Sequence, residues 1–203
     1  MTKQLKIFFV MAGLAMIAAP AQAYEKGDML LRVGAGSVDP KSDNSDVATV
    51  DTGTTLIFNG TYFFTPNIAL EVLAAAPFSH DVKLAADGSK VGETKHLPPT
   101  FSLLYHFNMD GVFHPYLGAG VNYTIFFDEE TSGALAGTSL ELDPSFGLAA
   151  QAGADFDLTE KMFLNVAVRW MDIDTDASIP ELPLDFNVEI DPWVYSIAIG
   201  WKF

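Results

Sequence analysis

The sequence predicts an all-β fold: an eight-stranded antiparallel transmembrane β-barrel of the bacterial outer membrane. Three observations indicate it. Eight segments alternate bulky apolar residues with small or polar ones, and the connections between them alternate between short and long. After residue 23, no uninterrupted apolar run is long enough to cross a bilayer as a helix. Each segment has roughly the ten residues that a tilted strand needs to cross a bilayer.

The first 23 residues have the features of a secretory signal peptide. Lys3 and Lys6 precede an apolar stretch, and Ala21 and Ala23 complete an A-x-A pattern. The stretch is shorter than the ~20 residues of a membrane helix. We therefore expect cleavage after Ala23, which leaves residues 24–203 as one barrel domain without cysteine.

The first four expected strands are DMLLRVGAG (28–36), TTLIFNGTYFF (54–64), NIALEVLAAA (67–76) and TFSLLYHFN (100–108). Each places bulky apolar residues on one face, as Met29, Leu31 and Val33 do in the first strand. The opposite face is less uniform, and it includes Arg32 and Glu71. Period-two alternation of this kind is typical of a strand between two different environments.

The last four expected strands are HPYLGAGVNYTIFF (114–127), SFGLAAQAGADF (145–156), MFLNVAVRWMD (162–172) and WVYSIAIGWKF (193–203). Their second face is mostly Gly, Ala, Ser and Asn, which suit the crowded interior of a narrow barrel. That face carries too few charges for a solvated surface. The bulky face is therefore expected to meet lipid, as in outer-membrane barrels.

Aromatic residues near the strand ends match the girdles found at the two membrane interfaces. They are Tyr62, Phe64, Tyr105, Phe107, Trp170, Trp193 and Trp201. The connections 65–67, 108–111 and 157–161 are short, whereas 37–53, 77–99, 128–144 and 172–187 are long, polar and rich in turn formers. Short periplasmic turns and long external loops place both chain ends in the periplasm.

Charge excludes one partner class. Without Lys3 and Lys6, nine basic residues face 26 acidic ones, and most acids lie in the long connections. Such a field repels nucleic acid. A solvated loop surface is the favoured interpretation of the acids, with divalent cations shared with lipopolysaccharide phosphates as the alternative. We expect no metal site and no cofactor.

Catalytic patterns are sparse, so we expect no enzyme activity. Ser102 and His106 share a face but lie ~13 Å apart along a strand. Ser79, His80 and Asp81 are adjacent, and adjacent residues rarely converge on one substrate atom. HExxH, GxSxG and Walker patterns do not occur in the sequence.

Five segments resemble the OmpW-type outer-membrane proteins in order and spacing: LAAAPFSH, HLPPT, PYLGAGVNYTIFFDEE, RWMDIDT and DPWVYSIAIGWKF. The resemblance implies an eight-stranded barrel with a narrow, largely apolar lumen, linked to uptake of small hydrophobic molecules. The closing strand, with Tyr195, Trp201 and Phe203 on one face, resembles the signal that bacterial barrel-assembly machinery recognises. The expected surroundings are outer-membrane lipids and lipopolysaccharide.

Strand parity predicts which side chains enter the lumen. The apolar ones are Leu30, Ile57, Phe63, Leu73 and Leu104. The resemblance places Leu73 at a constriction, and it marks Arg169 as a departure, because relatives often carry an aromatic residue there. A buried Arg169 needs an anion, and Glu71 is the only lumen-facing acid expected at comparable depth. We expect an Arg169–Glu71 pair, joined by Arg32, to plug the barrel.

Prolines flank the second long connection. Pro77 ends the third strand, while Pro98 and Pro99 begin the fourth, so both sides lack backbone donors at one height. One interpretation is a side window through which an apolar solute leaves the lumen into the outer leaflet. The alternative is that these prolines merely end strands.

Two main function classes follow. The first is passive passage of small hydrophobic or amphipathic solutes. The second is a lipid-modifying enzyme on the same scaffold, and a structural or stress-response barrel is a third possibility.

Overall fold

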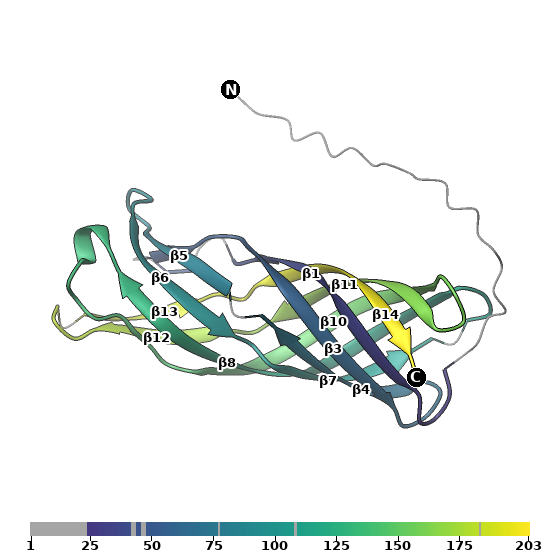
Figure 1. Ribbon diagram of the computed structural model, residues 1–203. Helices are drawn as coiled ribbons and strands as arrows, with labels where there is room; N and C mark the ends of the chain where they lie inside the picture. Colours follow the sequence, from purple (N-terminus) through teal and green to yellow (C-terminus); the bar gives the residue numbers. More distant parts are fainter. Residues whose placement is uncertain (1–23, 42–43, 46–47, 77, 108, 183) are drawn as a thin grey trace.

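Eight long strands form the protein's closed antiparallel barrel in the computed structural model (Figure 1). The structure describes residues 24–41, 44–45, 48–76, 78–107, 109–182 and 184–203, with the backbone alone for 48 and 78–80. The barrel strands are β1 (Met29–Asp39), β3 (Gly53–Phe63), β4 (Ile68–Ala75), β7 (Thr100–His106), β8 (Phe113–Thr131), β10 (Ser145–Asp157), β11 (Met162–Met171) and β14 (Trp193–Lys202). The predicted fold class is confirmed. The predicted signal peptide, residues 1–23, lies outside the described residues, and its cleavage stays a prediction.

Closure joins the first barrel strand to the last. β1 pairs with β14 from Leu30–Lys202 to Asp39–Trp193, and the backbone N–H of Phe203 donates to the carbonyl of Met29 at 2.9 Å. β8 and β10 also pair, which completes the ring. Among the described residues, no helix combines the length and the apolar character that crossing a membrane requires.

The bulky apolar side chains point outward, as expected for a barrel in lipid. Phe146 is 70% exposed and Leu148 is 62% exposed, whereas Leu30 and Phe63 are fully buried in the interior. Tyr195 of β14 and Phe203, which follows that strand, are also exposed. In water these side chains would be a liability, but in a bilayer they meet hydrocarbon.

The external segments differ from the irregular polar loops expected from the sequence. β8 continues beyond the barrel and pairs with β6 (Lys90–Leu97), followed by β5 (Phe78–Leu84) and β2 (Ala48–Val50). A second sheet contains β13 (Leu184–Glu189), β12 (Asp174–Ile179) and β9 (Glu141–Leu142), and a short 3-10 helix, η1, spans Gly133–Leu135. Figure 1 shows both sheets extending from one end of the barrel.

Alternation of buried and exposed residues explains why these external segments form strands, although they are rich in acids. In β12, Thr175, Ala177 and Ile179 are buried, while Asp174 and Asp176 are exposed. The charges and turn formers of these segments predicted loops, but every second residue of β12 packs inward. The external segments therefore enclose a small apolar core and keep their acids on the surface.

A matched pair of glycine variants tests how closely the strands approach. A Cβ on Gly120 of β8 would lie 1.9 Å from the carbonyl oxygen of Phe101, whereas the nearest atom to a Cβ on Gly60 of β3 would be 3.8 Å away. We expect Gly120→Ala to lower the free energy of unfolding by about 1–3 kcal/mol. Gly60→Ala should change it by less than about 0.5 kcal/mol. Urea unfolding in lipid vesicles measures both, and equal midpoints would contradict this packing.

Candidate functional site

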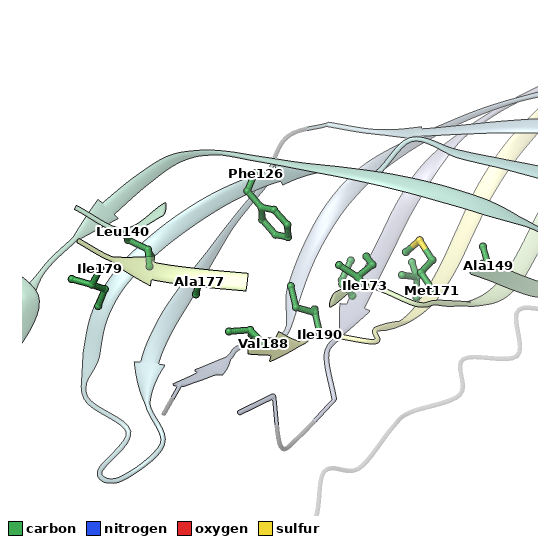
Figure 2. Packing of buried hydrophobic residues seen from close by; sticks show 11 residues of the cluster. Phe126, Leu140, Ala149, Met171, Ile173, Ala177, Ile179, Val188 and Ile190 are labelled. Carbon is green, nitrogen blue, oxygen red and sulfur yellow. The ribbon is translucent and has the colours of Figure 1, made fainter. Parts of the chain in front are cut away.

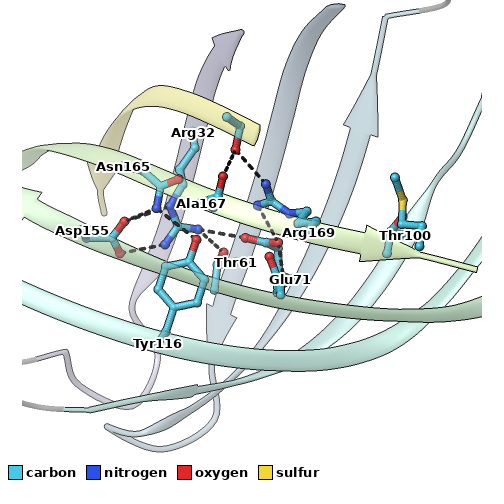
Figure 3. Close-up of polar contacts among 12 residues, drawn as sticks. Arg32, Thr61, Glu71, Thr100, Tyr116, Asp155, Asn165, Ala167 and Arg169 are labelled. Carbon is cyan, nitrogen blue, oxygen red and sulfur yellow. Dashed lines mark hydrogen bonds and ion pairs between the residues drawn. The ribbon is translucent and has the colours of Figure 1, made fainter. Parts of the chain in front are cut away.

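Four charged side chains meet inside the barrel and form what we call the lumen network: Arg32, Glu71, Asp155 and Arg169. They come from β1, β4, β10 and β11, and all are at most 3% exposed. Arg32 Nη2 lies 2.8 Å from Asp155 Oδ2, and Arg32 Nη1 lies 3.2 Å from Glu71 Oε2. Arg169 Nη2 lies 3.3 Å from Glu71 Oε1 (Figure 3). Two cations and two anions balance, so the network has no net formal charge.

Neutral side chains satisfy most of the remaining polar atoms of this network, although Arg169 Nε has no hydrogen-bond partner among the described residues. Thr61 Oγ1 accepts from Arg32 at 2.7 Å, and Ser196 Oγ accepts from Arg169 at 2.9 Å. The donors to the carboxylates are Gln151 to Glu71, and Asn165 and Tyr24 to Asp155. Buried charges are tolerated when they are both paired and hydrogen-bonded. The network therefore links β1, β4, β10 and β11 across the barrel interior.

The sequence analysis placed three members of this network together and missed the fourth. Arg169, Glu71 and Arg32 lie in contact, but Glu71 is not the only acid in the network, because Asp155 makes two hydrogen bonds to Arg32. Asp155 has lumen parity on β10, which was a usable signal. Its depth depends on register: Asp155 pairs with Asn165 on β11, four residues nearer the periplasmic end than the Gln151–Arg169 pair. Strand parity alone therefore could not place Asp155 beside Arg32.

The predicted apolar lumen residues do not form one gate. Phe63 and Leu104 belong to a buried group on the periplasmic side of the lumen network, together with Leu30 and Tyr24. The Tyr24 ring lies 4.5 Å from that of Phe63 and 5.0 Å from that of His106. Ile57 and Leu73 are buried on the other side, toward the external end. Apolar side chains therefore lie on both sides of the lumen network, together with buried polar residues such as Asn59 toward the external end and His106 toward the periplasmic end.

An apolar pocket lies above the barrel, between the two external sheets, and we call it the external pocket. One wall comes from β2, β5, β6 and β8, and the other from the β9–β12–β13 sheet and its flanks. Its lining residues are Val50, Val82, Thr94, His96, Phe126, Leu140, Leu142, Thr175, Ala177, Phe186, Val188 and Ile190. Several of them belong to one buried apolar cluster, which continues toward the barrel through Ile173 and Met171 (Figure 2).

The ladder between β4 and β7 stops short of the external sheets, and we call this interruption the β4–β7 gap. Its last pair is Leu73–Thr100, and pairing resumes between β5 and β6 at Phe78–His96. Residues 74–76 and 97–99 flank the gap. Pro77, one of the three prolines predicted to border a window, lies outside the described residues.

The two remaining prolines face different neighbours. The carbonyl of Pro99 accepts from the N–H of Tyr123 on β8 at 3.0 Å, so the missing donor of Pro99 belongs to the β8 side. Because successive residues of a strand point to opposite neighbours, Pro98 faces β4 near Ala75. The carbonyl of Pro98 accepts instead from Thr100 Oγ1 of its own strand at 3.1 Å. Pro98 is therefore the residue that borders the gap.

The external surface is dominated by acids. Its described lysines are engaged in surface ion pairs: Lys41 with Glu189, Lys83 with Asp51, Lys90 with Asp81 and Glu93, and Lys95 with Asp128. Burial raises the pKa of Asp174, and the nearby acids Asp191, Asp172 and Glu189 raise it further. In the described part of the chain, no group of three or more His, Cys, Asp or Glu is arranged to hold a metal ion.

The candidate catalytic residues do not gather into a described site. Ser102 and His106 are both buried in the lumen, and neither ring nitrogen of His106 has a hydrogen-bond partner among the described residues. The side chains of Ser79 and His80 lie outside the described part of the structure. Among the described side chains, Ser102 and His106 do not form a nucleophile with an oriented base.

Charge balance in the lumen network gives a testable stability difference. Glu71→Gln leaves Arg32 and Arg169 facing Asp155 alone, so an uncompensated positive charge remains inside the barrel. We expect the free energy of unfolding to fall by about 3–5 kcal/mol. The double variant Glu71→Gln/Arg169→Gln restores neutrality and should be more stable than Glu71→Gln. Urea unfolding in vesicles decides this: a double variant that loses the sum of both single losses would rule out charge balance as the cause.

Comparison with known proteins agrees with this architecture. The family model described as the OmpW family matches residues 25–203. Outer membrane protein W of Vibrio cholerae serotype O1 is 43% identical over 213 residues, covering 94% of this chain and 97% of that protein.

A solved structure and a more distant relative extend the comparison. The crystal structure of the outer membrane protein OprG from Pseudomonas aeruginosa superposes with a TM-score of 0.80 at 40% identity, covering 89% of this chain and 98% of that one. The dibenzothiophene metabolism operon protein PahQ of Pseudomonas aeruginosa is 28% identical over 189 residues, covering 91% of this chain and 82% of that protein. Because the family model and the relative from Vibrio cholerae both span nearly the whole described barrel, the chain belongs to the OmpW family of outer-membrane proteins.

Proposed function

We propose that this barrel is a passive conduit for small hydrophobic or amphipathic solutes. A solute enters the external pocket and leaves sideways, through the β4–β7 gap, into the outer leaflet of the membrane. The observation that carries the proposal is the order of the parts along the barrel: an apolar pocket, then an interrupted ladder, then a charged plug.

The external pocket supplies the affinity. Its walls are mostly aliphatic and aromatic side chains, so an apolar solute gains about 25 cal/mol for each Å² of surface that it removes from water. Thr94, His96 and Thr175 are the few polar residues in the lining. This composition is typical of sites for small apolar ligands.

The lumen network supports exit to the side. Glu71 lies four residues below Ala75 on β4, about 13 Å along the strand, so the plug sits on the periplasmic side of the gap. An apolar solute gains little by entering this layer of charged groups, most of whose polar atoms already bond one another. The gap, beside Ala75 and just above the Leu73–Thr100 pair, borders lipid, which makes the bilayer the favourable destination.

A relative is consistent with an apolar solute. The name of PahQ refers to an operon for dibenzothiophene metabolism, and dibenzothiophene is a flat, apolar aromatic compound. This supports the solute class for the present chain without identifying the solute.

Further partners belong to the same proposal. The lipid-facing residues Tyr195, Trp201 and Phe203 of the last strand and its end are available to barrel-assembly machinery. The acidic external sheets face the lipopolysaccharide layer, where divalent cations bridge anionic groups. Both partners stay predictions.

Proline variants test the exit route, and the two positions serve as a matched pair. Pro98→Val supplies an N–H toward Ala75 and should extend the β4–β7 ladder, so entry of a hydrophobic probe into cells should slow. Pro99→Val supplies a donor on the β8 side and should leave the gap open. The Pro98→Val/Pro99→Val double variant should behave like Pro98→Val. The measurement is probe uptake by cells with equal amounts of folded barrel, against cells without the protein.

The outcomes separate the parts of the proposal. Unchanged uptake in Pro98→Val would remove the lateral route, while equal slowing by both single variants would point to a general effect of proline loss. If wild-type cells took up hydrophobic probes no faster than cells lacking the protein, the conduit itself would be excluded.

A further inference from the structure

Met171 ends β11 inside the lumen, between the external apolar cluster and Arg169 of the lumen network. Its side chain is 3% exposed, and it belongs to the apolar cluster that also contains Ile173 and Ile190. Figure 2 shows Met171 between Ile173 and Ala149, on the barrel side of the cluster. Ile190 also lines the external pocket, so a continuous apolar cluster connects the pocket to Met171.

Met171 also reaches the border of the gap. Thr100 Oγ1 lies 3.6 Å from Met171 Sδ, although the two residues stand on β7 and β11, with β8 and β10 between them in the barrel wall. Thr100 forms the last pair of the β4–β7 ladder and bonds the carbonyl of Pro98. The Met171 side chain therefore extends across the lumen, and its sulfur contacts a residue that borders the β4–β7 gap.

Met171 is held by weaker side-chain contacts than Arg169, the residue below it on β11. Arg169 shares the lumen face of β11 but is tied to Glu71 and Ser196. Met171 is held by one weak contact to sulfur and by apolar packing. An unbranched thioether with three rotatable bonds adapts to irregular apolar space at low cost. A solute can displace this side chain much more readily than the charged plug.

We propose that Met171 is the shutter between the external pocket and the β4–β7 gap, and that its side-chain volume sets the largest solute cross-section that passes. This inference rests on the proposed conduit and adds a specificity-determining residue to it. In the closed position, Met171 packs across the lumen toward Thr100. When a solute arrives, the side chain changes rotamer and opens the way to the bilayer.

A volume series at this position tests the proposal. Cells carrying wild-type protein, Met171→Ala, Met171→Leu or Met171→Trp are given labelled n-octane, which is slender, and labelled adamantane, which is bulky. We expect Met171→Ala to raise the adamantane-to-octane uptake ratio about tenfold, because a few methylene-sized groups change discrimination in an apolar site by that order. Met171→Leu conserves volume and should keep the wild-type ratio. Met171→Trp should slow both solutes.

Leu148→Ala is the matched control, because Leu148 stands beside Ala149, the pairing partner of Met171, but faces lipid. It should leave the ratio unchanged. Heat-dependent gel mobility reports whether each barrel is folded, and the leucine and tryptophan variants still test the volume order if the alanine variant does not fold.

Two failures can be told apart. A wild-type protein that speeds neither solute would overturn the conduit and the shutter together. A wild-type protein that speeds uptake, while the ratio ignores the volume at position 171 or shifts equally in Leu148→Ala, would overturn the shutter alone.

Discussion

The need to satisfy every backbone N–H and C=O in hydrocarbon governs this structure. Closure of β1 on β14 removes the sheet edges, and each barrel strand then has two neighbours. The β4–β7 gap is the local exception. There a proline removes the donor that would face β4, and a side-chain hydroxyl satisfies the carbonyl that remains. The external apolar cluster reaches this interruption through Met171, whose sulfur contacts Thr100 Oγ1.

The lumen network turns the closed barrel into two compartments. Neither arginine can remain in a narrow interior without an anion, and neither carboxylate without a cation, so the four charges depend on one another. Their strands are held at fixed register by the ladders, which gives the network its geometry. The periplasmic compartment is filled by aromatic and apolar rings around Tyr24 and Phe63. Toward the external sheets, Leu73 and Met171 share the lumen with buried polar side chains such as Asn59, Thr100 and Asn122.

The periplasmic half of the barrel and the external pocket also differ in the contacts that hold them together. The periplasmic half combines ladder pairing with ion pairs and ring contacts. The walls of the external pocket belong to two different sheets, which pack against each other through apolar side chains. Asn44 also bridges them, because its side chain accepts from the N–H of Val50 on β2 and donates to the carbonyl of Glu189 on β13.

The sequence by itself determined the all-β class, the eight barrel strands and the side of each strand that faces lipid, because period-two alternation is a local property. It also pointed to Arg32, Glu71 and Arg169 as lumen residues. Only the tertiary structure decided that Asp155 completes their network, since depth in a barrel depends on strand register, which parity does not encode. The external sheets could not be predicted from the sequence for a related reason. Each of their strands has few inward-facing residues, and the apolar partners of these residues come from segments far apart in the chain. Likewise, the contact of Met171 with Thr100 arises only when the wall curves round and brings β7 opposite β11.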